Sequence, residues 1–354
     1  MEIIRTTKNI NELRSWYQAQ EALYSNLSQK VAAIIKEFLD QNNITYYAIT
    51  NRAKDIDSFI AKAEKDKYSD PKNQIKDLAG IRIITFVSSE VDSCSNLIKP
   101  LFKMDDQHSI DKRETLGTDK VGYRSVHYVG ELAEDRLRLP EFRPFKGMSF
   151  EIQIRTILEH AWADISHDRN YKFGGILPPD NDIQRRFSLA AATLELVDRE
   201  FNSLAREIDK YKEKVNQQTS EGDYEITINT PSLYEYMHKL LEDQIENNTI
   251  KPSFNGEEAI IIGELNSFGI DTLEDLKEII GDDINKFIYD STTFLGLLRD
   301  IMIIHDADKY FTDCWNNNWD GISTDDYTFY ADNGVAIDKI IDEYDLSIYP
   351  SDTI

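Results

Sequence analysis

The stretch Phe150-Glu151-Ile152-Gln153-Ile154-Arg155-Thr156 alternates apolar and polar residues as a half-buried β-strand does. Because successive side chains of a strand point to opposite sides, Glu151, Gln153 and Arg155 share one face. Ile152 and Ile154 take the other face, which we expect to join a core. An acid, an amide and a guanidinium in one row suit a binding site, although a solvated strand face has the same pattern.

Composition is that of a soluble protein with two domains. The chain has 354 residues, of which 41% are hydrophobic, and this is enough for two separate cores. No run approaches the roughly 18 apolar residues that a membrane span needs, and the start lacks a signal-peptide core. Cys94 and Cys314 are far apart in no ligand-like spacing, which predicts neither a disulfide framework nor a zinc site. We expect a cytoplasmic protein.

Charge divides the chain into two parts. Residues 221–354 hold 30 acidic against 7 basic residues, a net charge of −23, whereas residues 1–220 hold 34 against 33. Nearly all of the net charge of −24 therefore lies in the last third. Such asymmetry indicates two units with different tasks.

Hydrophobic periodicity predicts an α+β first domain and a mainly helical second one. The polar, turn-forming stretch 216–223 is the predicted linker, so the domains are residues 1–220 and 225–354. In the first domain the pattern predicts helices over 10–40, 55–67, 157–167 and 181–215, and strands over 44–50, 81–87, 123–130 and 148–155. In the second domain it predicts helices over 232–245, 260–268, 273–280, 292–304 and 335–344.

Two further motifs accompany the opening stretch. Asp77-Leu-Ala-Gly-Ile-Arg82 opens an apolar run to Val87, and Gly122-Tyr123-Arg124-Ser125-Val126-His127 opens another strand. Together the three segments resemble the synthetase domain of the RelA/SpoT family, well over residues 40–175. The resemblance implies a mixed β-sheet flanked by helices, of the nucleotidyltransferase-like kind. It also implies a pyrophosphokinase that moves the β,γ-pyrophosphate of ATP to the 3′-hydroxyl of GDP or GTP, yielding AMP and (p)ppGpp, the alarmone of the stringent response.

Asp77 and Glu151 match the acids that hold magnesium in this family, and the matching glutamate also serves as the base toward the acceptor hydroxyl. A few oxygen ligands, completed by phosphate, suit Mg²⁺. The plainer alternatives are a turn cap for Asp77 and a solvated strand face for Glu151. The coincidence of three motifs favours the site, because a motif counts in its context.

The ATP-binding residues implied by the resemblance are Arg52, Lys54, Ser58, Lys62 and Arg82. If positions 54, 58 and 62 lie on one helix, they share a face, and two ammonium groups and a hydroxyl project together. No glycine-rich phosphate loop occurs, so side chains must bind the phosphates. A solvated helix with neighbouring acids is the alternative.

The acceptor-binding residues implied by the resemblance are Lys120, Tyr123, His127, Gln153, Arg155 and His160. Tyr123 matches a tyrosine that lies against the acceptor guanine. Many family members have Lys-Pro-Asn before the Gly-Tyr pair, whereas this chain has Asp119-Lys120-Val121. This departure leaves the acceptor less determined than the reaction.

Two other functions remain open on the same fold. Toxic relatives pyrophosphorylate the 3′ end of tRNA, and a third possibility is an inactive nucleotide sensor, which the presence of both acids disfavours. The near-neutral net charge of the first domain does not indicate RNA binding. We expect no membrane or DNA partner, and no hydrolase domain of the kind that bifunctional family members carry.

The acidic second domain has two interpretations. It could be an accessory fold that aids solubility, because net charge acts on solubility first. Alternatively it could inhibit the first domain until a protein trigger draws it away. Some family members are toxic synthetases fused to a neutralising, phage-sensing domain, and the charge layout is similar to such a toxin–antitoxin arrangement.

Overall fold

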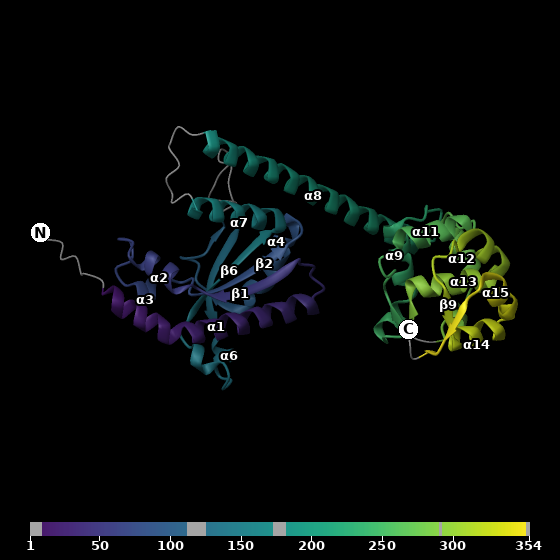
Figure 1. Cartoon of the computed structure of the whole chain (residues 1–354), viewed down its shortest axis with the longest axis horizontal. Helices are drawn as coiled ribbons and strands as arrows, with labels where there is room; N and C mark the ends of the chain where they lie inside the picture. Colours follow the sequence, from purple (N-terminus) through teal and green to yellow (C-terminus); the bar gives the residue numbers. More distant parts are fainter. Residues whose placement is uncertain (1–8, 112–124, 173–181, 290–291, 352–354) are drawn as a thin grey trace, which may run out of the picture. The chain divides into compact units, whose positions relative to one another are not determined.

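The computed structural model describes residues 9–111, 125–172, 182–289 and 292–351, with the backbone alone at 167–172 and 184. The chain forms two compact units, Met1–Ala205 and Arg206–Ile354 (Figure 1). The boundary falls inside one helix, α8 (Asp182–Glu221). The predicted linker over 216–223 was therefore wrong for most of its length, since the chain stays helical to Glu221 and turns only at Gly222, where φ is +84°.

The first unit is an α+β structure with one mixed sheet. Its helices, in addition to the first part of α8, are α1 (Ile10–Gln41), α2 (Ile56–Ala63), α3 (Pro71–Gln74), α4 (Ser88–Ile98), η1 (Lys99–Leu101), α6 (Glu134–Leu137), η2 (Arg143–Phe145) and α7 (Ile157–Lys172). Its strands are β1 (Ala48–Ala53), β2 (Ala79–Thr85), β3 (Phe102–Met104), β4 (Ile110–Asp111), β5 (Val126–Leu132) and β6 (Ser149–Thr156).

The described strands form one mixed sheet in the order β1-β2-β6-β5-β3, with β4 also paired to β5. Strand β2 runs parallel to β6, while the pairs β1–β2 and β5–β6 are antiparallel. This confirms the predicted mixed sheet flanked by helices. The register places Arg82 beside Gln153 and Gln153 beside His127, so one polar row crosses three strands.

The opposite face of the sheet is apolar and buried. Ile81, Ile83, Ile152 and Ile154 are fully buried there, as the alternation predicted. The same core takes in side chains from α1 and α4, including the fully buried Leu27, Ile35 and Cys94. Because this face is closed by helices, the polar face of the same strands is the one that can form a site.

Some sequence-based bounds differ from the structure. The first strand covers 48–53 rather than 44–50, and α4 was not predicted. The N-terminus of α4 is completed in part by a residue distant in sequence, which a local pattern does not contain. Asn202 of α8 accepts a hydrogen bond from the backbone N–H of Ser89, at 2.8 Å, and Glu90 accepts the N–H of Phe86, also at 2.8 Å.

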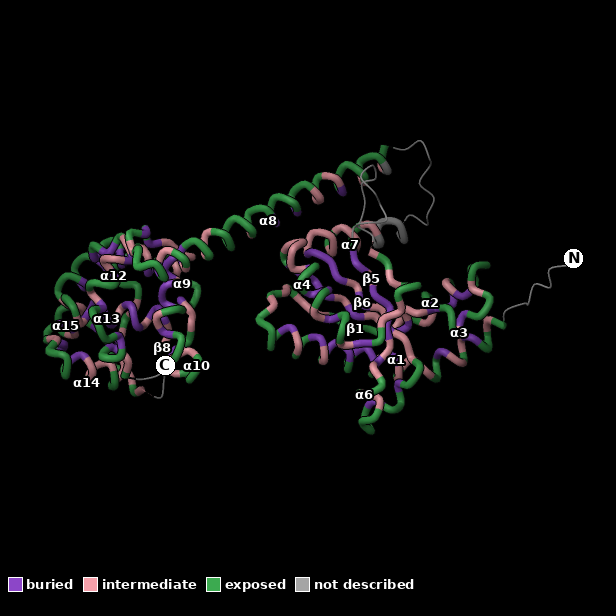
Figure 2. Tube along the Cα trace, turned by 180° about the vertical axis from the view of Figure 1, so that it is seen from behind, coloured by how far each residue is buried: buried purple, intermediate pink, exposed green. Residues whose placement is uncertain are grey.

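Helix α8 packs on the first unit through polar residues. Asp198 and Asn202 are buried, whereas the apolar Leu196 and Phe201 are 69% and 50% exposed. Figure 2 shows this helix largely in the exposed colour. The hydrogen bonds of Asp198 to Thr156 and of Asn202 to Ser89 explain why this side of α8 packs on the first unit.

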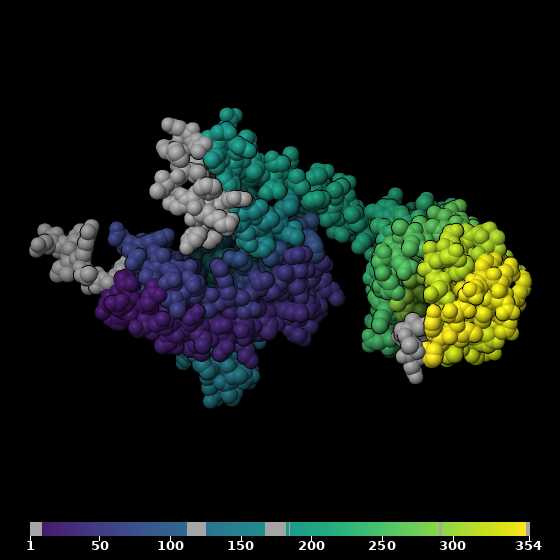
Figure 3. Space-filling model, viewed as in Figure 1, coloured from purple at the N-terminus to yellow at the C-terminus, as the bar shows by residue number. Residues whose placement is uncertain are grey.

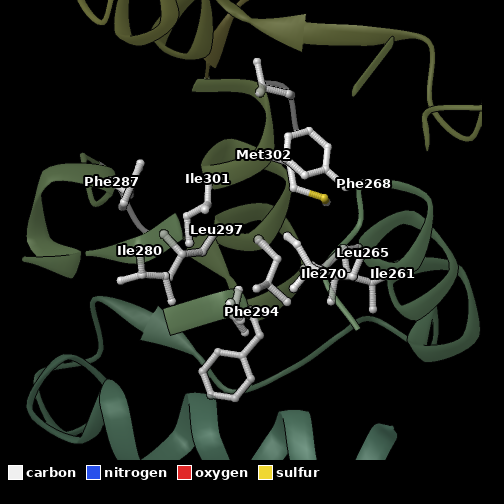
Figure 4. Close-up of a cluster of buried hydrophobic side chains, with 14 of the residues drawn as sticks. Ile261, Leu265, Phe268, Ile270, Ile280, Phe287, Phe294, Leu297, Ile301 and Met302 are labelled. Carbon is white, nitrogen blue, oxygen red and sulfur yellow. The ribbon is translucent and has the colours of Figure 1, made fainter. Parts of the chain in front are cut away.

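The second unit is mainly helical, as predicted, and is a closely packed body (Figure 3). Its elements are α9 (Thr230–Leu240), α10 (Glu242–Glu246), β7 (Ile250–Lys251), α11 (Glu258–Ser267), α12 (Leu273–Ile280), η3 (Ile284–Phe287), β8 (Thr292–Thr293), α13 (Phe294–Lys309), η4 (Tyr310–Cys314), β9 (Gly321–Ser323), α14 (Thr324–Asp332), α15 (Ile337–Tyr344) and β10 (Ser347–Tyr349). Helix α13 runs through its core, where Phe294, Leu297 and Ile301 are fully buried among side chains of α11 and α12 (Figure 4).

A buried acid in α13 predicts a pH-dependent stability. Asp300 accepts a hydrogen bond from the Tyr330 hydroxyl at 2.6 Å, and burial raises the pKa of Asp300 to about 7. An acid whose pKa is raised by folding stabilises the folded state while it is protonated. The contribution of Asp300 to the unfolding free energy is therefore full below the unfolded-state pKa near 4 and is lost as pH rises through 7. That loss is on the order of 4 kcal/mol.

Asp300→Asn should therefore flatten the fall in unfolding free energy of the full chain between about pH 5 and pH 8. Denaturant titrations at both pH values measure it, with the exposed Asp282→Asn as the matched control. Equal pH dependence in Asp300→Asn and the wild type would contradict the assignment.

No helix among the described residues combines the length and apolar character that crossing a membrane requires.

Candidate active site

The start of β2 and the end of β1 lie side by side because these two strands are antiparallel neighbours. Asp77 stands just before β2, and Lys54 follows β1. The backbone of Lys54 is held from two sides: its N–H donates to the carbonyl of Leu78 at 2.9 Å, and the hydroxyl of Tyr17 donates to its carbonyl at 2.5 Å. Tyr17 is fully buried in α1, so the helix and the sheet together fix this loop.

Two lysines converge on one carboxylate oxygen. The Nζ atoms of Lys54 and Lys62 each lie 2.8 Å from Oδ2 of Asp77. Lys62 projects from the last turn of α2. Lys54 lies before that helix, which begins only after the cap residue Asp55, so Lys54 and Lys62 do not share a helix face. Burial alone favours the neutral acid, yet the charges and hydrogen bonds of the lysines prevail and hold the pKa of Asp77 below its ordinary value.

Glu151 is held by two neighbours on the polar face. His127 Nδ1 lies 3.0 Å from its Oε1, and the Gln153 amide donates to its Oε2 at 2.7 Å. Burial raises the pKa of Glu151, while the hydrogen bond and charge of His127 and the bond from Gln153 lower it more, so the net shift is downward. Glu151 is therefore a carboxylate at neutral pH.

Asp77 and Glu151 line the same pocket, together with Thr50, Asn51, Arg52, Lys54, Gly80, Ile81, Arg82 and Gln153. The negative charge of Asp77 also raises the pKa of Glu151, which is the expected effect of one nearby acid on another. Gly80 pairs with Arg52 on one side and with Glu151 on the other. Since Gly80 has no side chain, the space between these two groups stays open.

The donor set fits a divalent cation that phosphate oxygens would help to bind. Oδ1 of Asp77 is buried and has no hydrogen-bond partner, whereas Oδ2 receives both lysines. A buried carboxylate oxygen without a partner is costly, and a cation would satisfy it. Across the described ranges no cluster of three or more His, Cys, Asp or Glu could hold a metal. Two carboxylates with phosphate and water are typical of Mg²⁺.

Two arginines and a histidine surround Asp164 of α7. Its carboxylate lies 4.0 Å from Arg82, 3.8 Å from Arg155 and 3.7 Å from His160. Burial lowers the pKa of His160, and the charge of Arg155 lowers it further. Arg155 is only 2% exposed and does not line the pocket, although it shares the strand face of Glu151.

Of the other predicted residues, Ser58 is not brought to the pocket. Ser58 lies at the start of α2, where its backbone N–H donates to the carboxylate of Asp55 at 2.9 Å, and it is exposed. Its hydroxyl also bonds to Asp55, so it acts there as part of the helix cap. Lys120 and Tyr123 lie outside the described residues.

Sequence reasoning missed three residues at or beside the site: Gly80, Ser125 and Asp164. Ser125 is fully buried and its Oγ lies 2.6 Å from Nε2 of His127. Strand periodicity could have found it, since it stands two residues before His127. Helix periodicity could have found Asp164, four residues after His160.

Known proteins are similar in sequence to the part of the chain that carries the pocket. The family model described as "Region found in RelA / SpoT proteins" matches residues 51–176, the segment with β1, β2, β5 and β6. Among curated proteins, the chain is 30% identical to the GTP pyrophosphokinase YjbM of Bacillus subtilis over 166 residues, which cover 46% of this chain and 73% of that protein. It is 26% identical to the GTP pyrophosphokinase YwaC of the same organism over 45% of this chain and 73% of that protein.

Among solved structures, small alarmone synthetase 1 from Bacillus subtilis aligns with a TM-score of 0.47 at 22% identity, over 55% of this chain and 98% of that one. The smu.1046c protein of Streptococcus mutans aligns with a TM-score of 0.40 at 27% identity, over 52% of this chain and 91% of that one. The sequence matches decide the assignment, because they cover most of the length of YjbM and fall on the strands that carry the pocket. The chain belongs to the RelA/SpoT family.

Proposed function

We propose that this protein is an ATP-dependent pyrophosphokinase that transfers the β,γ-pyrophosphate of ATP to the 3′-hydroxyl of GDP or GTP, giving AMP and (p)ppGpp. The observation that carries the proposal is the placement of Asp77 and Glu151 in one pocket with Lys54, Arg52 and Arg82. The curated relatives YjbM and YwaC, both named GTP pyrophosphokinases, support the same reaction.

The cations of the pocket bind the triphosphate. An ammonium group has three donors, so Lys54 and Lys62 can keep one bond to Asp77 while they reach phosphate oxygens. Arg82 stands on β2 and Arg52 on β1, and both line the pocket with Lys54. Side chains from separate elements therefore replace the glycine-rich loop that other nucleotide sites use, and they neutralise charge where the phosphoryl group moves.

Glu151 receives the acceptor. Its carboxylate accepts the hydrogen bond of the 3′-hydroxyl and takes its proton as the bond from that oxygen to the β-phosphorus forms. The bond between the β-phosphorus and the α,β-bridging oxygen breaks, and AMP leaves with that oxygen. The low pKa of Glu151 keeps it ionised, and His127 and Gln153 fix its direction.

Asp77 and Glu151 are the proposed ligands of Mg²⁺, and the ion would withdraw charge from the phosphates. The buried, unpartnered Oδ1 of Asp77 supports this assignment.

An acceptor assay tests the reaction. The full chain is incubated with γ-labelled ATP and Mg²⁺, and GDP, GTP and uncharged tRNA are offered separately. The proposal expects label in ppGpp or pppGpp and AMP in equal amount. Label on the tRNA 3′ end alone would keep the pyrophosphate chemistry and overturn the acceptor, and label in none of the three would overturn the activity.

We further propose that the acidic C-terminal part inhibits the synthetase until a protein trigger relieves it. The net charge of −23 over residues 221–354 supports this, because the pocket depends on a cluster of lysines and arginines. The first unit has a hydrophobic core of its own, made of residues between Leu13 and Ile154, so we expect it to fold without the second unit. Residues 1–220 should then be more active and more toxic to growth than the full chain, and equal activity with equal toxicity would contradict inhibition.

A further inference from the structure

Ser125 belongs to a chain of hydrogen bonds that ends on Glu151. Its Oγ lies 2.6 Å from Nε2 of His127, whose Nδ1 lies 3.0 Å from Oε1 of Glu151. Ser125 is fully buried, immediately before β5, and the proposed reaction gives it no task. We propose that Ser125 is a positioning residue whose hydroxyl sets the tautomer and the ring orientation of His127, and through them the direction of the Glu151 carboxylate.

The donors and acceptors of the chain fix the tautomer. A carboxylate can only accept, so Nδ1 of His127, 3.0 Å from Oε1 of Glu151, carries a proton and donates it. A neutral imidazole has one N–H, which leaves Nε2 as an acceptor. The hydroxyl of Ser125, 2.6 Å from Nε2, can donate to it, and the bond on one ring nitrogen influences which one is protonated.

Two bonds on the ring also prevent it from turning over. A flip of the imidazole would put carbon atoms where Nδ1 and Nε2 now lie, and both bonds would be lost. Strand pairing supports the same arrangement, because β5 and β6 place His127 directly opposite Gln153, the other residue that holds Glu151. The carboxylate is thus held at both oxygens, from two strands.

The order serine–histidine–carboxylate is also that of hydrolytic triads. A nucleophilic serine must reach a substrate, and Ser125 has 0% exposure. His127 and Glu151 keep 15% and 18% of their side chains exposed, so the open end of the chain is at the carboxylate. The geometry therefore serves Glu151 rather than an attack by Ser125. The kinetic part of this inference rests on the proposed pyrophosphokinase function, whereas the tautomer does not.

The test compares Ser125→Ala with Ser95→Ala in the full chain. Ser95 is a matched control, since it is also buried in the first unit and its hydroxyl donates to the Val91 carbonyl at 2.7 Å in α4. Long-range ¹H–¹⁵N spectra at about pH 8.5, where an ordinary imidazole is neutral, report the tautomer of His127. The wild type and Ser95→Ala should show the proton on Nδ1, and Ser125→Ala should show a mixture of both tautomers.

In the same variants kcat should fall by about 10- to 100-fold for Ser125→Ala, the usual effect of losing an outer hydrogen-bond partner. KM for ATP should change by less than about two-fold, because the lysines and arginines are untouched. If Ser125→Ala does not fold, Ser125→Cys keeps a weak donor of similar size and should show smaller changes in the same directions. An unchanged His127 tautomer, or an unchanged kcat, overturns the proposal. If the wild type does not catalyse the transfer at all, the proposed function is contradicted instead, and the spectra still test the tautomer of His127.

Discussion

Glu151→Gln should lower kcat by about a thousand-fold and leave the fold intact. Glutamine keeps the shape and still accepts a hydrogen bond from His127, but it cannot take a proton from the acceptor hydroxyl and it loses the negative charge. Removing a positioned general base costs typically 10²- to 10⁴-fold. Single-turnover transfer from labelled ATP to GTP, at saturating concentrations of both, measures the chemical step.

Glu131→Gln is the matched control for this change. Glu131 lies on β5, is 37% exposed, and stands 3.8 Å from the exposed Lys103, away from the pocket. This variant should retain full activity, which would show that losing a carboxylate elsewhere on the sheet is not sufficient to lower kcat. Wild-type activity in Glu151→Gln would remove Glu151 from the roles of base and metal ligand together.

Asp77→Asn should lower kcat/KM by about 10²- to 10³-fold, comparable to the loss of one preorganised electrostatic group. The amide cannot balance the charges of Lys54 and Lys62, which then repel each other beside the β2 start. The variant should also need more Mg²⁺ for half-maximal activity, and its unfolding free energy should fall by about 1–3 kcal/mol. Activity against Mg²⁺ concentration and a denaturant titration provide the two readouts.

Asp66→Asn controls for charge, since Asp66 is exposed and lies in the turn after α2. Its activity and Mg²⁺ requirement should match the wild type. If Asp77→Asn kept a wild-type Mg²⁺ requirement, Asp77 would be a partner of the lysines alone and the metal assignment would be wrong.

The parts of the fold that sequence predicted are those with strong local periodicity. The apolar alternation of Ile152 and Ile154 defined β6 and its buried face, and the three-to-four spacing defined α1 and α12. The same alternation put Glu151 and Gln153 on one face, where the structure bonds them to each other. These features depend on neighbours within a few residues, which a sequence displays directly.

The errors have tertiary causes. The spacing of Lys54 and Lys62 suggested that they could share a helix face, but the helix begins only after the cap residue Asp55. Lys54 instead reaches Asp77 because β1 and β2 are paired. The polar residues Asp198 and Asn202 became the packing side of α8 because their partners, Thr156 and Ser89, are 42 and 113 residues away in sequence. A local pattern cannot contain such partners.

The central claim is that Asp77 and Glu151 share one divalent ion over bound ATP. Titration of Mn²⁺ followed by electron paramagnetic resonance, in the presence of an ATP analogue with a non-cleavable α,β-bridge, tests it directly. We expect one tight Mn²⁺ site in the wild type, weakened at least about ten-fold by either Asp77→Asn or Glu151→Gln, the usual scale for altering a metal's surroundings. Wild-type Mn²⁺ affinity in one of these two variants would show that the carboxylates do not hold a common ion.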